Sequence, residues 1–484
     1  MFLFTFFRRI IFKTWNYIIV CLISASLTIL TYRFSTQSNR FNLLFSFTNL
    51  YPNFSNIFTC DVYDAINKSF SSYFRFCKGR NELKPNEGEC SDLFGFSSTL
   101  VESLETLALM KDHTLFRKAK QYLQSNNYFS TLELVDRHEF WSRVIGSFIG
   151  TYIITHDTFF LKQATFLADE TIKIETLNNN NYPAFINFKD STVKHRPFQN
   201  GTALSDILVG LPEISALYLL TKKEKYNERA NFLVDSVPPP PLRGVHYHFY
   251  DMKTKKPNSP LYFQPNFQET NDETYPSLTF EEIDGNTVGF YINLALDIKL
   301  RGNKKATLLL EHSSKHLNGS LGKDFYIIWP LLETIDLISD YHFFHLGEKE
   351  VEIRDTAYEA YEGPQFKIFQ WTSLNQSSNT LYNFQFSGTI PRLWLKKASI
   401  FESEGLRKKL KKLFAFSLGH CKYGYGFSSF KRTNDGIYLY SDIQNSEFLS
   451  EWMKAALLLA NRDDDLVKKM IINDRGHILA ISKG

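Results

Sequence analysis

The chain has 484 residues, of which 43% are hydrophobic and 22% charged, and its formal net charge is +4. That length supports a large core, and so balanced a charge excludes the strongly basic class of nucleic-acid-binding proteins. Phenylalanine is abundant, with 45 residues. Because Phe is among the residues most often buried, we assign most of these to the core rather than to ligand-binding platforms.

An uncharged apolar run near the start predicts a membrane anchor. Residues 14–32 carry no charged side chain, and about 20 such residues are enough for a helix to cross a bilayer. Three basic residues precede the run, so the positive-inside rule places residues 1–13 in the cytoplasm and the body in the lumen, as a single-pass type II protein. A cleaved signal peptide is the alternative. The lack of a small-x-small site after the run favours an uncleaved signal anchor.

Two features beyond the anchor fit the lumen of the endoplasmic reticulum or Golgi. Five N-x-S/T sequences, the acceptors of N-glycosylation, occur at Asn53, Asn67, Asn200, Asn318 and Asn375. Four of the five cysteines also follow the anchor, at Cys60, Cys77, Cys90 and Cys421. Disulfides persist in such a compartment, but the spacing alone leaves their pairing open.

The body of the chain is predicted to be helical. Residues 33–57, rich in Ser, Asn and Phe, are interpreted as a stem, and residues 58–484 as one folded domain. Residues 244–256 follow four prolines and alternate polar with apolar side chains, which predicts an inserted β-hairpin. A solenoid would require a fixed repeat period, and the sequence has none. Apolar residues recur at helical spacing over about 93–107, 140–154, 158–176, 204–220, 283–300, 324–340, 348–361, 389–418 and 445–460.

Several motifs occur in an order that carries a family resemblance. They are NELKP (81–85), FGFSSTLVESLETLALM (94–110), HEFWSRVIGSFIGTY (138–152), LPEISALYLLTKKEKY (211–226), GVHYHFYDMKTKKP (244–257), SEFLSEWMKAALLLANRDDDL (446–466) and INDRGHIL (472–479). In sequence and spacing these resemble motifs of glycoside hydrolase family 47, the class I α1,2-mannosidases. The resemblance covers nearly all of residues 58–480.

The resemblance implies an all-α fold, an (α/α)7 barrel of helical hairpins, with a bound Ca²⁺ and recognition of α1,2-linked mannose on high-mannose N-glycans. The segments 324–335 and 421–431 resemble the subgroup of ER-degradation-enhancing mannosidase-like proteins. That subgroup ties an early cysteine to a late one, so the resemblance pairs Cys90 with Cys421. A thiol oxidoreductase is then a possible partner.

Inverting glycoside hydrolysis needs a proton donor and a carboxylate base about 6.5–9.5 Å apart, with water between them. The resemblance places Glu139 at the position of the acid, and Arg143, one turn along the helix, beside it. Glu213 matches a substrate-binding glutamate. Without the resemblance, the first two residues would be an ordinary helix ion pair. Glu213 would be a solvated residue near a helix start.

The expected base is missing from the motif that should supply it. That motif falls within 284–299, where Val288 and Ile292 occupy the positions of the catalytic Asp and Glu. If the alignment slides by one residue, Gly289 and Asn293 occupy them instead. Neither alignment supplies a carboxylate.

Other acidic positions of the family are also replaced. Lys367 stands where a further catalytic glutamate belongs, and a cation cannot act as a carboxylate base. Gly388 and Asn445 replace two more cleft glutamates. At the Ca²⁺ position, Asp474 replaces a threonine and could supply hard oxygen ligands. Arg475 follows in place of a glutamate, and the loss of neighbouring acids weakens such a metal site.

Two functions follow as hypotheses. The first is an α1,2-mannosidase that trims N-glycans in the endoplasmic reticulum or Golgi. The second is a catalytically silent relative that binds glycans or glycoproteins as a quality-control factor in ER-associated degradation. The family resemblance favours the first, whereas the missing base favours the second, because the inverting mechanism requires it.

Overall fold

The computed structural model describes residues 57–92, 96–110, 113–126, 129, 132–179, 182–195, 201–239, 246, 249–257, 285–317, 380–386, 388–433 and 437–482. All of them belong to one compact unit, Asn53–Gly484. The predicted cytoplasmic tail, the anchor and nearly all of the stem lie outside these residues. The predicted helices at 324–340 and 348–361 and the side chain of Lys367 lie outside them as well.

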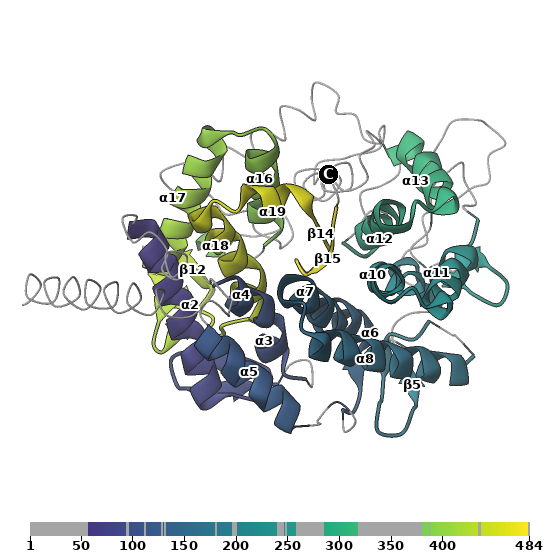
Figure 1. The fold of residues 1–484 in the computed structure, drawn as a ribbon, viewed down its shortest axis with the longest axis horizontal. Coiled ribbons are helices and arrows are strands. Elements are labelled where there is room, and N and C mark those ends of the chain that lie inside the picture. The colour runs from purple at the N-terminus through teal and green to yellow at the C-terminus, as the bar shows by residue number, and fades with distance from the viewer. Residues whose placement is uncertain are drawn as a thin grey trace, which may run out of the picture. The chain divides into compact units, whose positions relative to one another are not determined.

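Helices dominate the described chain (Figure 1). They are α2 (Ile57–Phe76), α3 (Ser98–Glu102), α4 (Leu104–Leu109), α5 (His113–Ser125), α6 (Arg137–Glu139), the π-helical η3 (Phe140–Ile145), α7 (Gly146–Thr155), α8 (Thr158–Leu177), α9 (Leu204–Ile207), α10 (Leu211–Thr221), α11 (Glu224–Ser236), α12 (Gly285–Arg301), α13 (Lys304–Leu317), α16 (Thr389–Ile400), α17 (Glu404–His420), the π-helical η5 (Phe448–Trp452), α18 (Met453–Asn461) and α19 (Asp464–Lys469).

Short antiparallel strands connect the helices, so the all-α prediction needs correction to a mainly helical fold with small sheets. The described sheets have the orders β1-β2, β3-β4-β5, β6-β7-β8, β13-β12-β9, β10-β11 and β14-β15. The strands are β1 (Glu82–Lys84), β2 (Glu89–Ser91), β3 (Val135–Asp136), β4 (Phe185–Ile186), β5 (Val193–Lys194), β6 (Thr202–Ala203), β7 (Phe249–Asp251), β8 (Lys256–Pro257), β9 (Thr380–Phe384), β10 (Lys422–Tyr423), β11 (Gly426–Phe427), β12 (Phe430–Thr433), β13 (Tyr438–Tyr440), β14 (Met470–Ile472) and β15 (Ile478–Ile481).

The predicted inserted hairpin is confirmed, because β7 pairs with β8 through Tyr250 and Pro257. The predicted helix at 158–176 is confirmed as α8. The run at 389–418 is instead two helices, α16 and α17. Glu402 has a left-handed backbone with φ of 51°, and the Ser403 side chain caps α17 by accepting a hydrogen bond from the Leu406 N–H. A side-chain oxygen at this position satisfies a free N–H of the first turn.

Consecutive helices pack in pairs: α7 with α8, α10 with α11, α12 with α13, and α16 with α17. Serial helical hairpins are therefore confirmed for this part of the chain. The stretch Leu204–Thr221 is long and apolar enough to cross a membrane, with a mean hydropathy of 1.4, but 72% of it is buried inside the protein. Its helix α10 packs on α11 and α12, as a core helix does.

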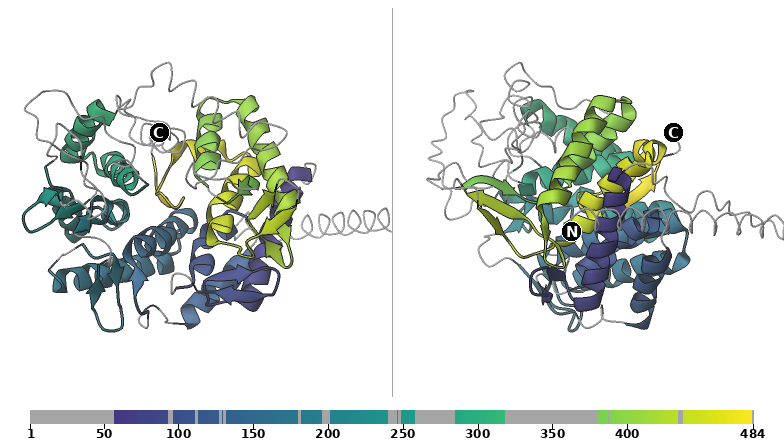
Figure 2. Two further views of the ribbon diagram at one scale, coloured as in Figure 1. Left: turned by 180° about the vertical axis from the view of Figure 1, so that it is seen from behind. Right: turned by 90° about the vertical axis from the view of Figure 1, so that its left-hand side faces the viewer.

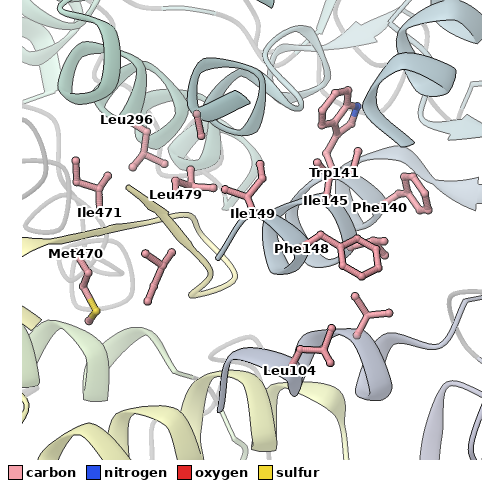
Figure 3. Close-up of a cluster of buried hydrophobic side chains, with 14 of the residues drawn as sticks. Leu104, Phe140, Trp141, Ile145, Phe148, Ile149, Leu296, Met470, Ile471 and Leu479 are labelled. Carbon is pink, nitrogen blue, oxygen red and sulfur yellow. The ribbon is translucent and has the colours of Figure 1, made fainter. Parts of the chain in front are cut away.

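The β14–β15 hairpin is packed into the core. Strand β15 contacts α7 and α10, and Figure 3 shows its Leu479 near Ile149 of α7 and Leu296 of α12. All three side chains are fully buried. Helix α2 lies beside α17 and α18 (Figures 1 and 2). Early and late segments of the chain therefore meet, and the candidate site lies where they do.

The predicted disulfide between Cys90 and Cys421 is wrong. Cys90 is bonded to Cys77, with the two Cα atoms 5.5 Å apart, a separation typical of disulfides. Cys421 is a buried free thiol, and burial raises its pKa well above the usual value. The prediction of a thiol oxidoreductase partner depended on the Cys90–Cys421 pairing and therefore loses its support.

Candidate functional site

Glu139 and Arg143 lie where a regular helix changes to a wider π-helical turn. Glu139 is the last residue of α6. Asp136 caps this helix, because its carboxylate accepts a hydrogen bond from the Glu139 N–H at 3.1 Å. Arg143 lies in η3 and forms an ion pair with Glu139. Only 4% of the Arg143 side chain is exposed. Single π-helical turns within α-helices occur frequently at functional sites.

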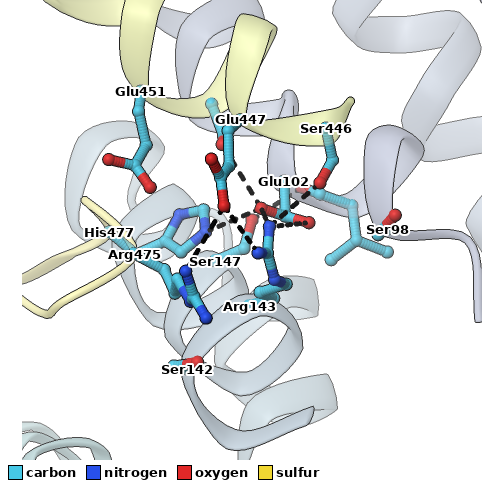
Figure 4. Close-up of polar contacts among 12 residues, drawn as sticks. Ser98, Glu102, Ser142, Arg143, Ser147, Ser446, Glu447, Glu451, Arg475 and His477 are labelled. Carbon is cyan, nitrogen blue, oxygen red and sulfur yellow. Dashed lines mark hydrogen bonds and ion pairs between the residues drawn. The ribbon is translucent and has the colours of Figure 1, made fainter. Parts of the chain in front are cut away.

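Arg143 gathers carboxylates from three parts of the chain, and Figure 4 shows two of them, Glu102 and Glu447. Besides pairing with Glu139, its Nη1 lies 3.1 Å from Glu102 in α3. It also donates to the Ser446 hydroxyl at 3.0 Å, and its Nη2 lies 2.8 Å from Glu447. A buried guanidinium with several carboxylate partners remains charged and fixes their orientation.

A second arginine reaches the same carboxylates from the turn between β14 and β15. Arg475 forms an ion pair with Glu139, and its Nη1 lies 3.3 Å from Glu447. Burial by itself would raise the pKa of Glu139, but the charges of Arg475 and Arg143 outweigh it and hold the pKa well below the usual value. In this arrangement Glu139 is therefore ionised, whereas a proton donor works best with a raised pKa.

Asp474, the predicted Ca²⁺ ligand, is already bound to cations. Its carboxylate lies 3.0 Å from Nε2 of His138, and its carbonyl oxygen accepts from Arg392 at 2.9 Å. Burial would lower the pKa of His138, but the charge of Asp474 and hydrogen bonding to it raise the pKa to about 10. The described residues hold no group of three or more His, Cys, Asp or Glu arranged for a metal. The Asp474 carboxylate is thus paired with His138 in this structure, and the Ca²⁺ site stays a prediction.

Glu213 in α10 faces the same cluster and is only 2% exposed. It accepts a hydrogen bond from the Asn473 side chain at 2.8 Å. Burial raises the pKa of Glu213 to about 7, although the hydrogen bond from Asn473 opposes the rise. The alternative of a solvated helix residue is therefore wrong.

A buried triad of charged side chains, made up of His477, Glu105 and Lys454, lies next to the turn between β14 and β15. His477 bonds to Glu105 of α4 at 2.7 Å, and Lys454 of α18 bonds to the other oxygen of Glu105 at 2.8 Å. Glu105 and His477 are fully buried. Gly150 leaves the space that Glu105 occupies, because a Cβ there would overlap the Glu105 carboxylate.

Sequence reasoning missed Glu447 and Glu451, although both stand in the matched motif at 446–466. Glu451 in η5 is 4% exposed and lies 3.2 Å from Arg392. Gly388, interpreted as a lost acid, makes room for it: a Cβ on Gly388 would overlap the Glu451 carboxylate. The i, i+4 spacing of the two glutamates was the signal that could have identified them.

The replaced positions in α12 supply no carboxylate to the site. Val288 lies in the first turn of the helix. Ile292 is 5% exposed and part of the core. Asn293 is 8% exposed and donates to the Leu208 carbonyl at 3.2 Å. In either alignment, the two residues that replace the catalytic Asp and Glu carry no charge.

Asn445 lines a pocket next to the charged cluster. The pocket has a volume of about 270 Å³ and is also lined by Phe386, Ser429, Ser441 and Glu447. The Asn445 Oδ1 atom is buried without a hydrogen-bond partner among the described residues. Because buried polar atoms are almost always hydrogen-bonded, this oxygen has an unused capacity to accept a hydrogen bond.

The sequence model described as Glycosyl hydrolase family 47 matches residues 65–291. The chain is 23% identical to pig mannosyl-oligosaccharide 1,2-alpha-mannosidase IA over 458 residues, which cover 87% of this chain and 67% of that protein. It is 24% identical to mouse endoplasmic reticulum mannosyl-oligosaccharide 1,2-alpha-mannosidase over 263 residues, or 53% of this chain and 37% of that protein.

The fold is similar to that of a solved α-1,2-mannosidase from Trichoderma reesei. The TM-score is 0.65 at 15% sequence identity, and the match covers 89% of this chain and 99% of that one. The likeness of fold thus extends well beyond the residues that the sequence model matches.

Proposed function

The chain belongs to glycosyl hydrolase family 47, and from this premise we propose that it recognises high-mannose N-glycans on secretory-pathway glycoproteins without hydrolysing them. The relatives named as mannosyl-oligosaccharide 1,2-alpha-mannosidases support the glycan class. The endoplasmic reticulum relative supports the compartment.

The wider architecture is part of the same proposal. The described helical hairpins are those of an (α/α)7 barrel, which the Trichoderma reesei structure supports. Residues 14–32 anchor the barrel in the membrane of the endoplasmic reticulum or Golgi, with the barrel in the lumen. A silent glycan-binding relative of this kind suits glycoprotein quality control in ER-associated degradation.

The single observation that carries the proposed lack of hydrolysis is that Glu139 forms ion pairs with two arginines. A general acid must hold its proton before the leaving oxygen takes it. Arg143 and Arg475 both contact the Glu139 carboxylate, and together they keep its pKa well below the usual value. Holding this proton at neutral pH therefore requires the loss of at least one ion pair.

Recognition of a neutral sugar does not require the proton. The pocket beside Glu447 is lined by Ser429, Ser441, Asn445 and Phe386 among other residues, and the Asn445 Oδ1 has no hydrogen-bond partner among the described residues. A ligand site typically combines a few such polar groups with an apolar wall. The arrangement supports binding of a pyranose through its hydroxyls and its apolar face.

The test is a paired assay of the full-length protein in detergent micelles or nanodiscs. Release of mannose from a high-mannose N-glycan is measured with and without Ca²⁺, alongside an active α1,2-mannosidase. Binding of the same glycan is measured by titration. We expect saturable binding and no release above that of Glu139→Gln.

Two results would overturn the proposal. Release of mannose that disappears in Glu139→Gln would make the chain a working mannosidase, with Glu139 as its acid despite the two arginines. Failure of the wild-type protein to bind the glycan at any concentration would remove the recognition function itself.

A further inference from the structure

Asn473 is a buried side chain that joins several elements at the candidate site through hydrogen bonds. It is 3% exposed. Its Oδ1 accepts from the N–H groups of Arg475 at 3.1 Å and His477 at 2.9 Å. Its Nδ2 donates to the Ser142 carbonyl at 2.8 Å and to the Glu213 carboxylate at 2.8 Å. One amide therefore satisfies its full hydrogen-bonding capacity by joining three elements.

The backbone around Asn473 forms a tight turn that depends on these bonds. The Asn473 N–H donates to the His477 carbonyl at 2.9 Å, and the Gly476 N–H donates to the Asn473 carbonyl at 3.1 Å. Gly476 has φ of +78°, a conformation that glycine adopts without strain. The turn carries Asp474 and Arg475 toward α6 and η3, while His477 points to Glu105.

Helix α7 is shaped to receive this amide. Gly146, its first residue, lies beside Asn473, and a Cβ there would lie 2.6 Å from the Asn473 Nδ2. Ser142, whose carbonyl accepts from Nδ2, lies in the π-helical turn η3 that leads into α7. The absence of a side chain at 146 therefore opens the space that the amide fills.

From this geometry we propose that Asn473 is the positioning residue of the glycan site, which holds Glu213 and the Asp474–Arg475 turn in one fixed arrangement. The amide contacts Glu213 on one side and the backbone of Arg475 on the other. The inference rests on the proposed function, because the turn carries Arg475, whose Nη1 lies 3.3 Å from Glu447 in the lining of the proposed glycan pocket. Preorganised groups bind more tightly because less ordering remains to be done on binding.

The decisive experiment separates positioning from stability by using Gly146. Asn473→Ala removes all four side-chain bonds, and we expect at least a tenfold loss of affinity for a high-mannose N-glycan together with a lower melting temperature. The double variant Gly146→Ala/Asn473→Ala places a methyl group in the vacated space. We expect it to regain at least half of the lost melting temperature while its affinity stays at least tenfold below that of the wild type.

Gly419→Ala is the matched control, because a Cβ there meets no atom within 4 Å, and it should bind as the wild type does. If affinity recovers together with melting temperature in the double variant, Asn473 only stabilises the fold and the inference is wrong. Wild-type affinity in Asn473→Ala leads to the same conclusion. In either case the wild-type protein still binds glycan, so failure here differs from failure of the proposed function, in which no variant binds.

Discussion

Glu139 and Glu447 precede two π-helical segments in the same way and share the same two arginine partners. Glu139 immediately precedes η3, and Glu447 immediately precedes η5. Both carboxylates contact Arg143 and Arg475. The four side chains thus form a ring in which each charge has at least two opposite neighbours, and the loss of one leaves the others still paired.

Arg475→Gln should test how strongly this set holds the turn. It removes the second cation from both glutamates, and we expect a loss of about 1–3 kcal/mol in the free energy of unfolding, below the range for a fully buried pair because 27% of the Arg475 side chain is exposed. Urea unfolding measures the loss. Arg80→Gln, which breaks an exposed pair with Asp92, should change little. Equal effects of the two substitutions would mean that the Arg475 pairs are as weak as exposed ones.

Gly388→Ala should be destabilising because the added methyl group overlaps the carboxylate of Glu451. Overpacking of this kind costs about 1–3 kcal/mol, measured as a shift in the urea midpoint. The double variant Gly388→Ala/Glu451→Gly should lose less than the sum of the two single changes, since both the carboxylate and the Cβ that the added methyl group overlaps are then gone. Gly419→Ala provides the control, because its helical site has open space and alanine is the better helix former. Strict additivity would show that the two residues do not meet.

Removal of the disulfide should destabilise the protein without disturbing Cys421. The bond joins residues 13 apart in sequence, and a loop of that size corresponds to about 3 kcal/mol. We expect Cys77→Ser/Cys90→Ser to lose stability of that order in urea unfolding. Peptide mapping without reductant should recover Cys77 linked to Cys90, with Cys421 alkylated only after denaturation. A peptide joining Cys90 to Cys421 would contradict the structure.

Glu82 should make stability fall as pH rises. It is 4% exposed, and burial raises its pKa from 4.5 to about 7, partly opposed by the hydrogen bond it accepts from the Ser446 N–H. Between these values only the folded state holds the proton, so stability decreases with pH up to about 7 and is then constant. The decrease is on the order of 3 kcal/mol.

Glu82→Gln keeps an acceptor for the Ser446 N–H but cannot lose a proton. Urea unfolding at a series of pH values from about 5 to about 8, which span the titration, should therefore show a smaller decrease in stability for the variant. The variant should also be the more stable protein at the alkaline end. Parallel pH profiles would show that Glu82 is not the group responsible.

The sequence was sufficient for the helical pattern and for the placing of Glu139 beside Arg143. Both follow from local spacing: α8 shows helical periodicity, and residues four apart share a helix face. The same local reasoning could not see that Gly210, with φ of +81°, separates α9 from α10 within one apolar run. A left-handed glycine is compatible with either a break or a continuous helix until the packing is known.

The candidate site was harder to predict because its partners come from distant parts of the chain. Arg475 was recognised as a departure from the family motif, but its contact with Glu139 spans 336 residues. Asp474 was assigned to a metal because its bond to His138 could not be foreseen. Pairing of Cys90 was assigned by resemblance, whereas the observed bond to Cys77 depends on the end of α2 lying beside β2.

The meeting of early and late segments has a consequence for synthesis. Glu105 leaves the ribosome long before Lys454 and His477, which pair with its carboxylate, and Glu139 long before Arg475. Until then the nascent polypeptide contains charges that are buried in the final fold but still lack their counterions. Its hydrophobic core is also incomplete, so apolar surface is exposed. The N-terminal half can reach its final form only after translation has passed residue 477, so chaperones have a long interval in which to act on it.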